Sequence, residues 1–363
     1  MVRFLNDIAS LSDDDELREI VSKTYMKGEI SLSFESEPSF FNSISILGES
    51  QEVLIIRDLE NEKIIGFMIK SIKNVFINGH PKKVRYLSSL RLLEEYRRGR
   101  LMHQGFQYLK SFIENSNMIN FTTIIEDNSY ARDMLTSSRA GLPNYLPIGK
   151  MKTFIIKPTS RVRYKSKTNI KIEKGISKFS LKEIISFLHK EGSKKDFFPV
   201  YTEEMFNSSQ LRDFDINNLY IAHNEMDILG IVGVWDQTRF KQTVVKALSN
   251  KYKLLKPFNN YILSPMFNYP LISPPGKIRS FYINLISIRN NNPDILSLLI
   301  DQISIDYSNF GYNYFIIGLS ENDNLCLGLK NFRSLTYDSI LYLVDYKRTV
   351  PLTRTPYLEI SRL

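Results

Sequence analysis

The chain has 363 residues, of which 43% are hydrophobic and 24% are charged. These are ordinary values for a folded globular protein, and the length suits two domains that each bury a core of their own. The formal net charge of +9 would suit nucleic acid, an anionic membrane or a phosphate-bearing cofactor. A lysine-rich solvated surface produces the same charge, so composition alone does not specify a partner.

Cysteine and histidine usage indicates the cellular compartment and argues against a metal site. The single cysteine, Cys326, cannot form an internal disulfide, which fits a reducing cytoplasm. A catalytic role for Cys326 is formally open, and burial as a small apolar side chain is the favoured alternative. The four histidines are scattered without zinc-type spacing, so we expect no metal.

We expect a cytoplasmic protein with no membrane partner. The first twenty residues become acidic quickly and lack the apolar core of a signal peptide. No run approaches the roughly twenty apolar residues that a spanning helix needs.

A basic loop between a predicted strand and a predicted helix is the most informative stretch. Residues 84–93 have the buried pattern of a strand, and Glu94–Tyr96 turn the chain. Arg97–Arg100 follow, and residues 101–112 carry apolar side chains at helical spacing. Unpaired N–H groups at a helix N-terminus, together with arginines, suit a phosphate group. The alternative is a solvated basic turn.

The next elements extend this pattern into a recognisable order. Phe121–Ile125 are typical of a second strand, and a short helix follows that Asp127 or Asn128 would cap. The order strand, basic loop, helix, strand, Asn-x-x-Ala helix resembles the acetyl-CoA-binding half of the GNAT acyltransferases.

This resemblance implies a set of coenzyme contacts. The loop from Arg97 to Met102 would hold the pyrophosphate of acetyl-CoA, while Asn128 and Ala131 would face the pantetheine arm. Backbone at Leu92 and Leu93 would contact the thioester oxygen. The implied cofactor-binding residues are Leu92, Leu93, Arg97, Arg98, Gly99, Arg100, Leu101, Met102, Asn128 and Ala131.

The loop departs from the family pattern, in which two small residues approach the pyrophosphate. Those positions fall on Arg100 and Met102, and Gly99 stands one place early. Close approach of backbone to phosphate normally needs glycine. Direct pairing of the additional arginines with phosphate oxygens would compensate.

The catalytic residues are left unassigned. Many GNAT proteins carry a tyrosine at the position of Leu135 to protonate the leaving thiolate, and Tyr130 and Tyr145 lie nearby in this sequence. The polar residues close to the turn that are considered for the base are Glu94, Glu95, Ser88, Ser89 and Arg91.

The second half repeats the order of elements without the basic loop. Helices are predicted over residues 180–189 and 293–308, and strands over 219–223, 228–235, 280–288 and 312–319. At the place of the arginines stands Arg289–Asp294, where a proline and an aspartate favour a capped helix. We therefore expect no coenzyme site in this half.

The polar segment 158–169 carries four positive charges and no apolar periodicity, so it is predicted to separate two domains. The predicted units are residues 1–158, a linker at 159–169 and residues 170–363. A solvated linker is favoured over a nucleic-acid contact because no aromatic platform or base-reading helix accompanies it.

Three further stretches are open to two interpretations each. The loop 135–145 with Arg139 precedes a strand predicted over 149–157, and Arg139 would either line an acceptor mouth or be solvated. The cluster 235–242 would recognise a substrate or hold the domains together. Residues 252–275, rich in aromatics and proline, would form a lid or pack between domains. The first two stretches also resemble bacterial tandem GNAT-like proteins.

Together these features predict an α/β (α+β) protein with two GNAT-like domains, each a mixed, mostly antiparallel sheet flanked by helices. The resemblance implies an acetyl-CoA-dependent N-acyltransferase acting on a small-molecule or peptide amine. A protein that binds a CoA-like ligand without chemistry is the alternative. A transferase that uses aminoacyl-tRNA is a third hypothesis, although we do not expect a nucleic-acid partner.

Overall fold

The computed structural model describes residues 3–97, 101–114, 116–137, 141–162, 169–267, 270, 272–346 and 351–363. Most of its strands belong to one twelve-stranded sheet in the described part of the chain. In chain order these strands are β1 (Phe4–Ile8), β3 (Ser50–Asp58), β4 (Lys63–Ile77), β5 (His80–Leu92), β6 (Ile119–Ile125), β7 (Asn144–Ile156), β8 (Lys171–Lys174), β9 (Leu219–His223), β10 (Ile228–Trp235), β13 (Ser280–Ile288), β14 (Tyr314–Ser320) and β15 (Ser334–Asp345).

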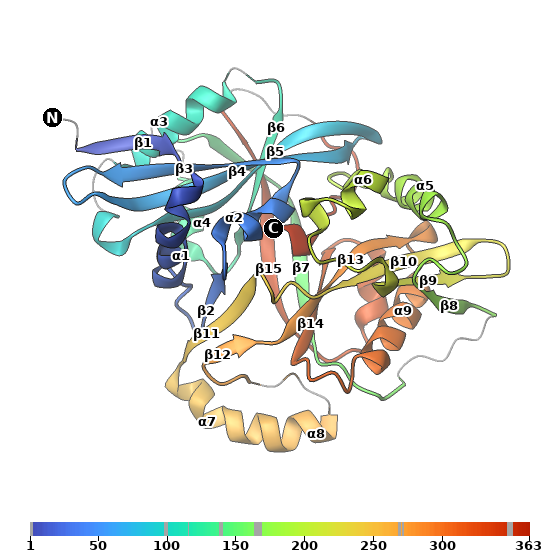
Figure 1. The fold of residues 1–363 in the computed structure, drawn as a ribbon. Helices are drawn as coiled ribbons and strands as arrows, with labels where there is room; N and C mark the ends of the chain where they lie inside the picture. Colours follow the sequence, from blue (N-terminus) through green and yellow to red (C-terminus); the bar gives the residue numbers. More distant parts are fainter. Residues whose placement is uncertain are drawn as a thin grey trace.

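The order of the strands across the sheet differs from their order in the chain. It runs β1-β3-β4-β5-β6-β15-β7-β14-β13-β10-β9-β8, so β15 lies between β6 and β7 while β7 lies between β15 and β14 (Figure 1). Each half therefore contributes its last strand to the sheet of the other half. The division at residues 159–169 stays a prediction, and hydrogen-bonded strands cross it.

A small second sheet also joins distant parts of the chain. Its order is β12 (Gly276–Ile278), β11 (Gln242–Leu248) and β2 (Ile30–Glu35). Strand β11 pairs with β2 from Gln242 opposite Glu35 to Leu248 opposite Ile30.

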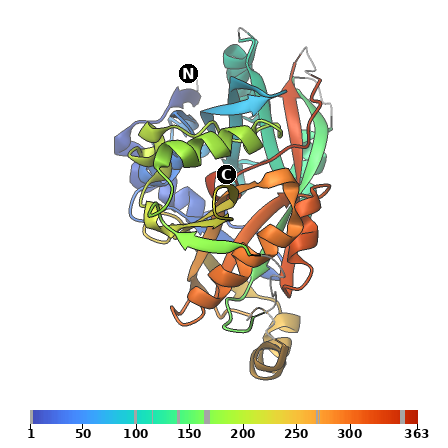
Figure 2. The same cartoon turned by 90° about the vertical axis from the view of Figure 1, so that its right-hand side faces the viewer.

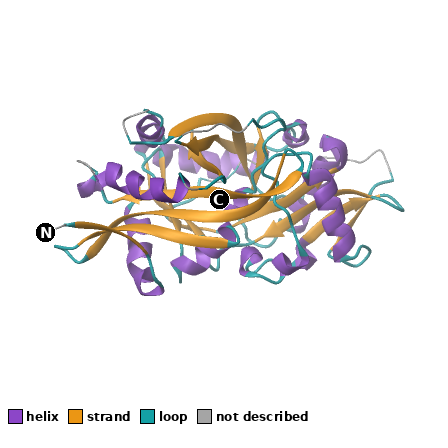
Figure 3. Ribbon diagram, turned by 90° about the horizontal axis from the view of Figure 1, so that it is seen from above, coloured by secondary structure: helices purple, strands orange, loops and turns teal. Residues whose placement is uncertain are grey.

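Helices lie on both faces of the large sheet (Figure 3). They are α1 (Asp14–Lys23), α2 (Phe40–Ile44), α3 (Leu101–Ile113), α4 (Ser129–Leu135), α5 (Leu181–Gly192), α6 (Glu203–Phe206), α7 (Asn250–Phe258), α8 (Ser264–Phe267) and α9 (Pro293–Asp306). Local sequence explains several boundaries. Ser180 and Glu183 form a capping box at α5, and Asn292 caps α9, which begins with Pro293.

Several predicted elements are confirmed. The predicted strands 219–223, 228–235 and 280–288 coincide with β9, β10 and β13. The hairpin turn between β4 and β5 has positive φ angles at Asn78 and Gly79, as an Asn-Gly turn favours. The predicted start of the strand at Gly149 is wrong, because β7 begins at Asn144 and pairs with β15 along its whole length.

The C-terminal segment lies buried at the centre of the molecule, where the two halves meet (Figure 1). The Arg362 Nε atom donates to the carbonyl of Ile46 at 2.9 Å, and Lys73 Nζ donates to the Arg362 carbonyl at 2.5 Å. Lys241 Nζ donates to the carbonyl of Leu363 at 2.6 Å. The C-terminal tail, which contains a 3₁₀ turn (Ile360–Arg362), thereby joins Ile46 and Lys73 of the first half to Lys241 of the second.

Burial of Lys241 makes the stability of the fold depend on pH. Its pKa is lowered from 10.5 to about 8, so the unfolded chain binds this proton more tightly than the folded one. Below pH 8 the folded chain carries the desolvated Lys241 ammonium, which lowers the free energy of unfolding. This loss of stability disappears as the pH rises toward 10.5. Between pH 7 and 9.5 the free energy of unfolding of wild type should rise by about 2 kcal/mol relative to Lys241→Met. Urea denaturation at both pH values measures this difference.

The exposed Lys251 of α7 provides the matched control. Lys251→Met should follow wild type at both pH values, since its ammonium stays in water. If the free energy of unfolding changed with pH equally in wild type and Lys241→Met, the pH dependence could not be assigned to Lys241.

Candidate functional site

The candidate site begins where two neighbouring parallel strands separate. Strands β5 and β6 pair over Val84–Tyr86 and Ile119–Phe121 and then diverge. The Thr122 hydroxyl donates to the carbonyl of Leu87 at 2.6 Å at the narrow end of the resulting wedge. Beyond this point β6 keeps its antiparallel pairing with β15 on the other side. The wedge therefore exposes one edge of each strand to a ligand.

A β-bulge in β5 shapes one wall of this wedge. Phe67 of β4 lies opposite Arg91, whereas Ile69 lies opposite Ser88, so β5 carries one additional residue over this interval. Ser89 in the bulge has φ 54°, in the left-handed region. A bulge takes backbone groups out of the regular ladder, and Ser88, Ser89 and Leu90 line the space beside the wedge.

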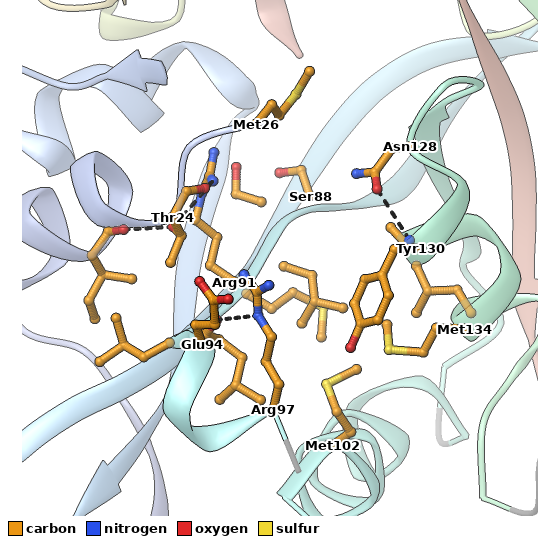
Figure 4. Close-up of a pocket in the computed structure, with 18 of the residues that line it drawn as sticks. Thr24, Met26, Ser88, Arg91, Glu94, Arg97, Met102, Asn128, Tyr130 and Met134 are labelled. Atoms are coloured by element: carbon orange, nitrogen blue, oxygen red, sulfur yellow. Dashed lines mark hydrogen bonds between the residues drawn. The ribbon is translucent and has the colours of Figure 1, made fainter. Parts of the chain in front are cut away.

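The wedge opens into a cavity of about 790 Å³. Its walls come from α1, β5, the 3₁₀ turn Glu94–Tyr96, β6, α4 and the first turns of α3. Arg97, Met102 and Tyr130 approach one common space from three different elements (Figure 4). The apolar side chains that line the cavity include Met68, Met102, Phe106, Met134 and Leu135.

Arg91 supplies a partly buried positive charge between the cavity and α1. Its Nη1 atom donates to the carbonyl and to the hydroxyl of Thr24, the latter at 3.3 Å, where α1 ends. A cation there balances the negative end of the helix dipole. Burial lowers the pKa of Arg91 to about 10, which leaves it charged at neutral pH. Its Nε and the hydroxyl of Ser88 are buried without a hydrogen-bond partner among the described residues.

Six of the ten predicted coenzyme residues line this cavity: Leu92, Leu93, Arg97, Met102, Asn128 and Ala131. Arg97 donates from Nε to the carbonyl of Leu92 at 3.2 Å. Leu101 is buried and packs with Ile65 and Leu92. Arg98, Gly99 and Arg100 lie outside the described residues, as does Arg139.

Two of the placed residues already have structural partners. The backbone N–H of Leu93 donates to the carbonyl of Ile65 at 2.9 Å, so the bulge at Ser89 is the better candidate for contact with a ligand carbonyl. The Asn128 side chain accepts from the backbone N–H of Ala131 at 3.2 Å and caps α4. The expected cap is confirmed, and the amide nitrogen of Asn128 forms no hydrogen bond with the described residues.

The tyrosines differ in their access to the cavity. Tyr130 is 61% exposed, and its hydroxyl points into the cavity (Figure 4). Tyr145 also lines the cavity, and burial raises the pKa of its phenol. Leu135, at the position where the resemblance expects a tyrosine, is a buried part of the wall.

The carboxylates around the mouth all have partners. Glu94 pairs with Lys27 at 3.0 Å, and the hydrogen bond from that lysine lowers the pKa of Glu94. Glu95 lies 3.6 Å from Lys63. The others are Glu16, which accepts from the backbone of Ile64, and Glu19, which pairs with Lys23. None of these carboxylates stands out as a general base.

The second half contains a wedge of the same construction, and the chain itself fills it. Strands β13 and β14 are parallel over Ser280–Tyr282, and Leu285 has φ 52° beside a bulge. The buried carboxylate of Glu359 accepts from the Leu285 N–H at 2.9 Å and from the Tyr201 hydroxyl at 2.8 Å. The Tyr357 hydroxyl donates to the same oxygen at 3.0 Å. Burial, the largest influence, raises the pKa of Glu359.

Sequence reasoning missed Glu359, Thr24 and the Ser89 bulge. Glu359 lies more than seventy residues from the strand that it contacts, and no local pattern links the two. The bulge follows from how β5 pairs with β4, and the sequence has no glycine there to mark a positive φ.

The cluster 235–242 connects segments of the fold. Gln242 exchanges hydrogen bonds with the backbone of Glu37 at 2.7 and 2.9 Å, and Gln237 donates to the carbonyl of Ser361 at 2.8 Å. The Trp235 indole donates to the carbonyl of Arg212 at 2.9 Å. Of the two interpretations of this cluster, these contacts favour the one in which it holds the two halves of the chain together.

No protein-family model matches the sequence, and no curated protein shows significant similarity to it. Solved structures are nevertheless similar along nearly the whole chain. Saccharomyces cerevisiae N-myristoyltransferase with bound myristoyl-CoA aligns with a TM-score of 0.62 and 11% identity, covering 96% of this chain and 80% of that chain. A GCN5-related N-acetyltransferase from Sphaerobacter thermophilus aligns with a TM-score of 0.61 and 9% identity, covering 97% and 99%.

A third similar structure is the GCN5-related glucosamine N-acetyltransferase region of a fungal multi-domain GH3 beta-N-acetylglucosaminidase. Its TM-score is 0.61 at 12% identity, over 94% of this chain and 38% of that chain. The protein described here thus has the GNAT fold, and the predicted α/β class with a mixed, mostly antiparallel sheet is confirmed. Similarity at this level of identity establishes the fold, while an activity has to be argued from the site.

Cys326 should behave as an unreactive thiol. Its Sγ donates to the carbonyl of Ser320 at 3.3 Å, and burial raises its pKa to about 11. Because the thiolate is the nucleophile, iodoacetamide at pH 8 should modify the native protein at least about tenfold more slowly than the urea-unfolded protein. Mass spectrometry over time measures both rates. Equal rates would show that the thiol is accessible and ionised in the native state.

Proposed function

We propose that the protein is an acyl-CoA-dependent N-acyltransferase whose donor site is the wedge between β5 and β6. The observation that carries this proposal is the wedge itself, in which a bulged strand leaves the ladder and opens into a cavity of about 790 Å³. Its size and its polar and apolar walls suit an extended coenzyme better than a compact metabolite.

The pantetheine arm of coenzyme A would lie in the wedge as an additional strand. Its two amides match the backbone groups that β5 and β6 expose after Tyr86 and Phe121, which is the chemistry of strand addition. Asn128 and Ala131 at the start of α4 would border the other side. The apolar wall, which includes Met102 and Met134, would accept the methylene groups.

The phosphates would lie near Arg97, toward the start of α3. This helix has thirteen residues, and its N-terminal N–H groups favour an anion. Arg97 reaches the cavity and can pair directly with phosphate oxygens. Arg98 and Arg100 are neighbours in the sequence, and we include them in the proposed phosphate loop.

The proposed reaction is direct attack of an amine on the thioester carbonyl. The new C–N bond forms as the C–S bond breaks, the amine loses a proton, and the thiolate of coenzyme A takes one up. Redirected backbone N–H groups in the bulge around Ser89 would stabilise the carbonyl oxygen as it becomes negative. Tyr130 is the hydroxyl that points into the cavity near this chemistry.

We propose acetyl as the transferred group and a small-molecule or peptide amine as the acceptor. The acceptor would enter between α1 and the turn Glu94–Tyr96, where carboxylates and lysines alternate. The chemistry is proposed for the first half alone. In the second half Glu359 occupies the bulge that a thioester oxygen would need. We further propose that the halves are tandem repeats of one unit.

A protein that binds CoA without turnover is the second candidate. The ion pair with Lys27 at the mouth favours it, because it lowers the pKa of Glu94 and so makes this carboxylate a weaker base. Measured binding without transfer to any amine of a broad panel would select this candidate.

Titration calorimetry with acetyl-CoA tests the donor site. Wild type should bind in the micromolar range, and Arg97→Ala should bind about tenfold more weakly because it loses a charge-assisted hydrogen bond to phosphate. Met134→Trp, which fills the cavity, should also weaken binding. A series of acyl-CoA donors of increasing chain length, with detection of the acylated amine, then tests the acetyl preference.

Arg289 at the corresponding place in the second half provides the matched control. It pairs with Asp227 at 3.3 Å, far from the cavity in sequence and outside its lining. Arg289→Ala should bind acetyl-CoA as wild type does. If wild type shows no heat of binding, the donor site proposed here is refuted, whatever the variants do.

A further inference from the structure

A helical arm projects from the edge of the molecule that is remote from β1 (Figures 1 and 2). It comprises α7 (Asn250–Phe258), a π-helical turn (Asn259–Leu263) and α8 (Ser264–Phe267). Its inner side is tied down by hydrogen bonds. Asn260 exchanges two with the backbone of Ile272, at 2.8 and 3.0 Å, and the Ser264 hydroxyl accepts from Lys157 at 2.7 Å.

The outer side of this arm is apolar and faces solvent. Leu254, Phe258, Ile262 and Met266 recur every four residues and therefore form a stripe along the helix. Leu254 is 81% exposed and Met266 60%, and Tyr261 beside them is 82% exposed. A stripe of this kind normally packs against a core. Here it lies unpartnered among the described residues.

The arm also lies in an unusually basic part of the chain. Residues 237–293 contain no aspartate or glutamate, and their cationic residues are Arg239, Lys241, Lys246, Lys251, Lys253, Lys256, Lys277, Arg279 and Arg289. Lys251 and Lys253 are exposed on the arm, and no described carboxylate forms an ion pair with them or with Lys256. Apolar side chains and unpaired lysines thus share one exposed helix.

We propose that this arm docks on an anionic lipid surface. The apolar stripe would enter the boundary between headgroups and acyl chains, and the lysines would meet lipid phosphates. Lys251 precedes Leu254 and Leu255 by three and four residues, so it lies on their face of the helix. Lysine is rare in the core of protein–protein interfaces. Beside a bilayer, its long aliphatic side chain lets the ammonium reach the lipid headgroups.

Such docking needs no spanning segment. The described residues contain no helix that is long and apolar enough to cross a membrane. The sequence alone predicts no membrane partner, and the exposed stripe on the folded arm is the observation that argues for peripheral attachment. The proposal does not depend on the donor site, because arm and cavity share no lining residue.

Co-sedimentation of the whole protein with vesicles tests the proposal. The probes are vesicles of phosphatidylcholine alone and of phosphatidylcholine with phosphatidylglycerol at about 3:1. Wild type should sediment with the anionic vesicles at low salt and be released at about 0.5 M salt, where the electrostatic attraction is screened. Absence of binding to the anionic vesicles would overturn the proposal.

Two variants separate the apolar and the electrostatic contributions. Leu254→Ser/Phe258→Ser/Ile262→Ser and Lys251→Gln/Lys253→Gln/Lys256→Gln should each reduce vesicle binding at least about tenfold. The matched control, Leu11→Ser/Met226→Ser, removes two other exposed apolar side chains and should bind as wild type does. Thermal melting checks that all variants stay folded.

Variants that sediment like wild type would overturn the assignment to the arm. The proposal would also be overturned if the stripe served self-association. In that case light scattering would show a wild-type dimer that the serine variant loses, and vesicles would bind neither protein. Binding to phosphatidylcholine alone, equal to that on anionic vesicles, would also refute the role of charge.

Discussion

The exchange of β7 and β15 between the two halves is the constraint on which the rest of the structure depends. Strand β15 pairs with β6 on one side and with β7 on the other, so the second half completes the sheet of the first. Because β6 is held by β15, it can separate from β5 without losing its own hydrogen bonds on both edges. The wedge that we propose as the donor site is therefore open only because a strand from the other end of the chain supports its wall.

The two wedges have similar backbone geometry and differ in what occupies them. Ser89 and Leu285 both adopt positive φ beside a bulge where a parallel pair ends. In the first half this point opens into the cavity, while in the second half Glu359 satisfies the redirected backbone. Three donors thus hold the buried carboxylate of Glu359 in the second wedge, whereas the first wedge opens into the cavity.

Local patterns were informative wherever neighbouring residues decide the structure. The buried runs of β9, β10 and β13 and the Asn78–Gly79 turn depend on side-chain period and on backbone freedom within a few residues. Six of the residues that the resemblance implies for coenzyme contact, among them Arg97 and Asn128, line the cavity, and their contact with a coenzyme stays a prediction. The start of β7 at Asn144 was not predicted from the sequence, since only the long pairing with β15 makes residues 144–148 a strand.

By itself the sequence determined the class of fold, the succession of elements and the stretch that lines the cavity, because apolar spacing and capping residues act over one or two turns of chain. Tertiary structure decided which strands became neighbours, where Glu359 came to lie and that the stripe of Leu254 and Phe258 would face outward. The physical reason is that backbone hydrogen bonds are chemically alike along the chain. Their partners, and the surfaces left uncovered, are therefore set only when the whole sheet has assembled.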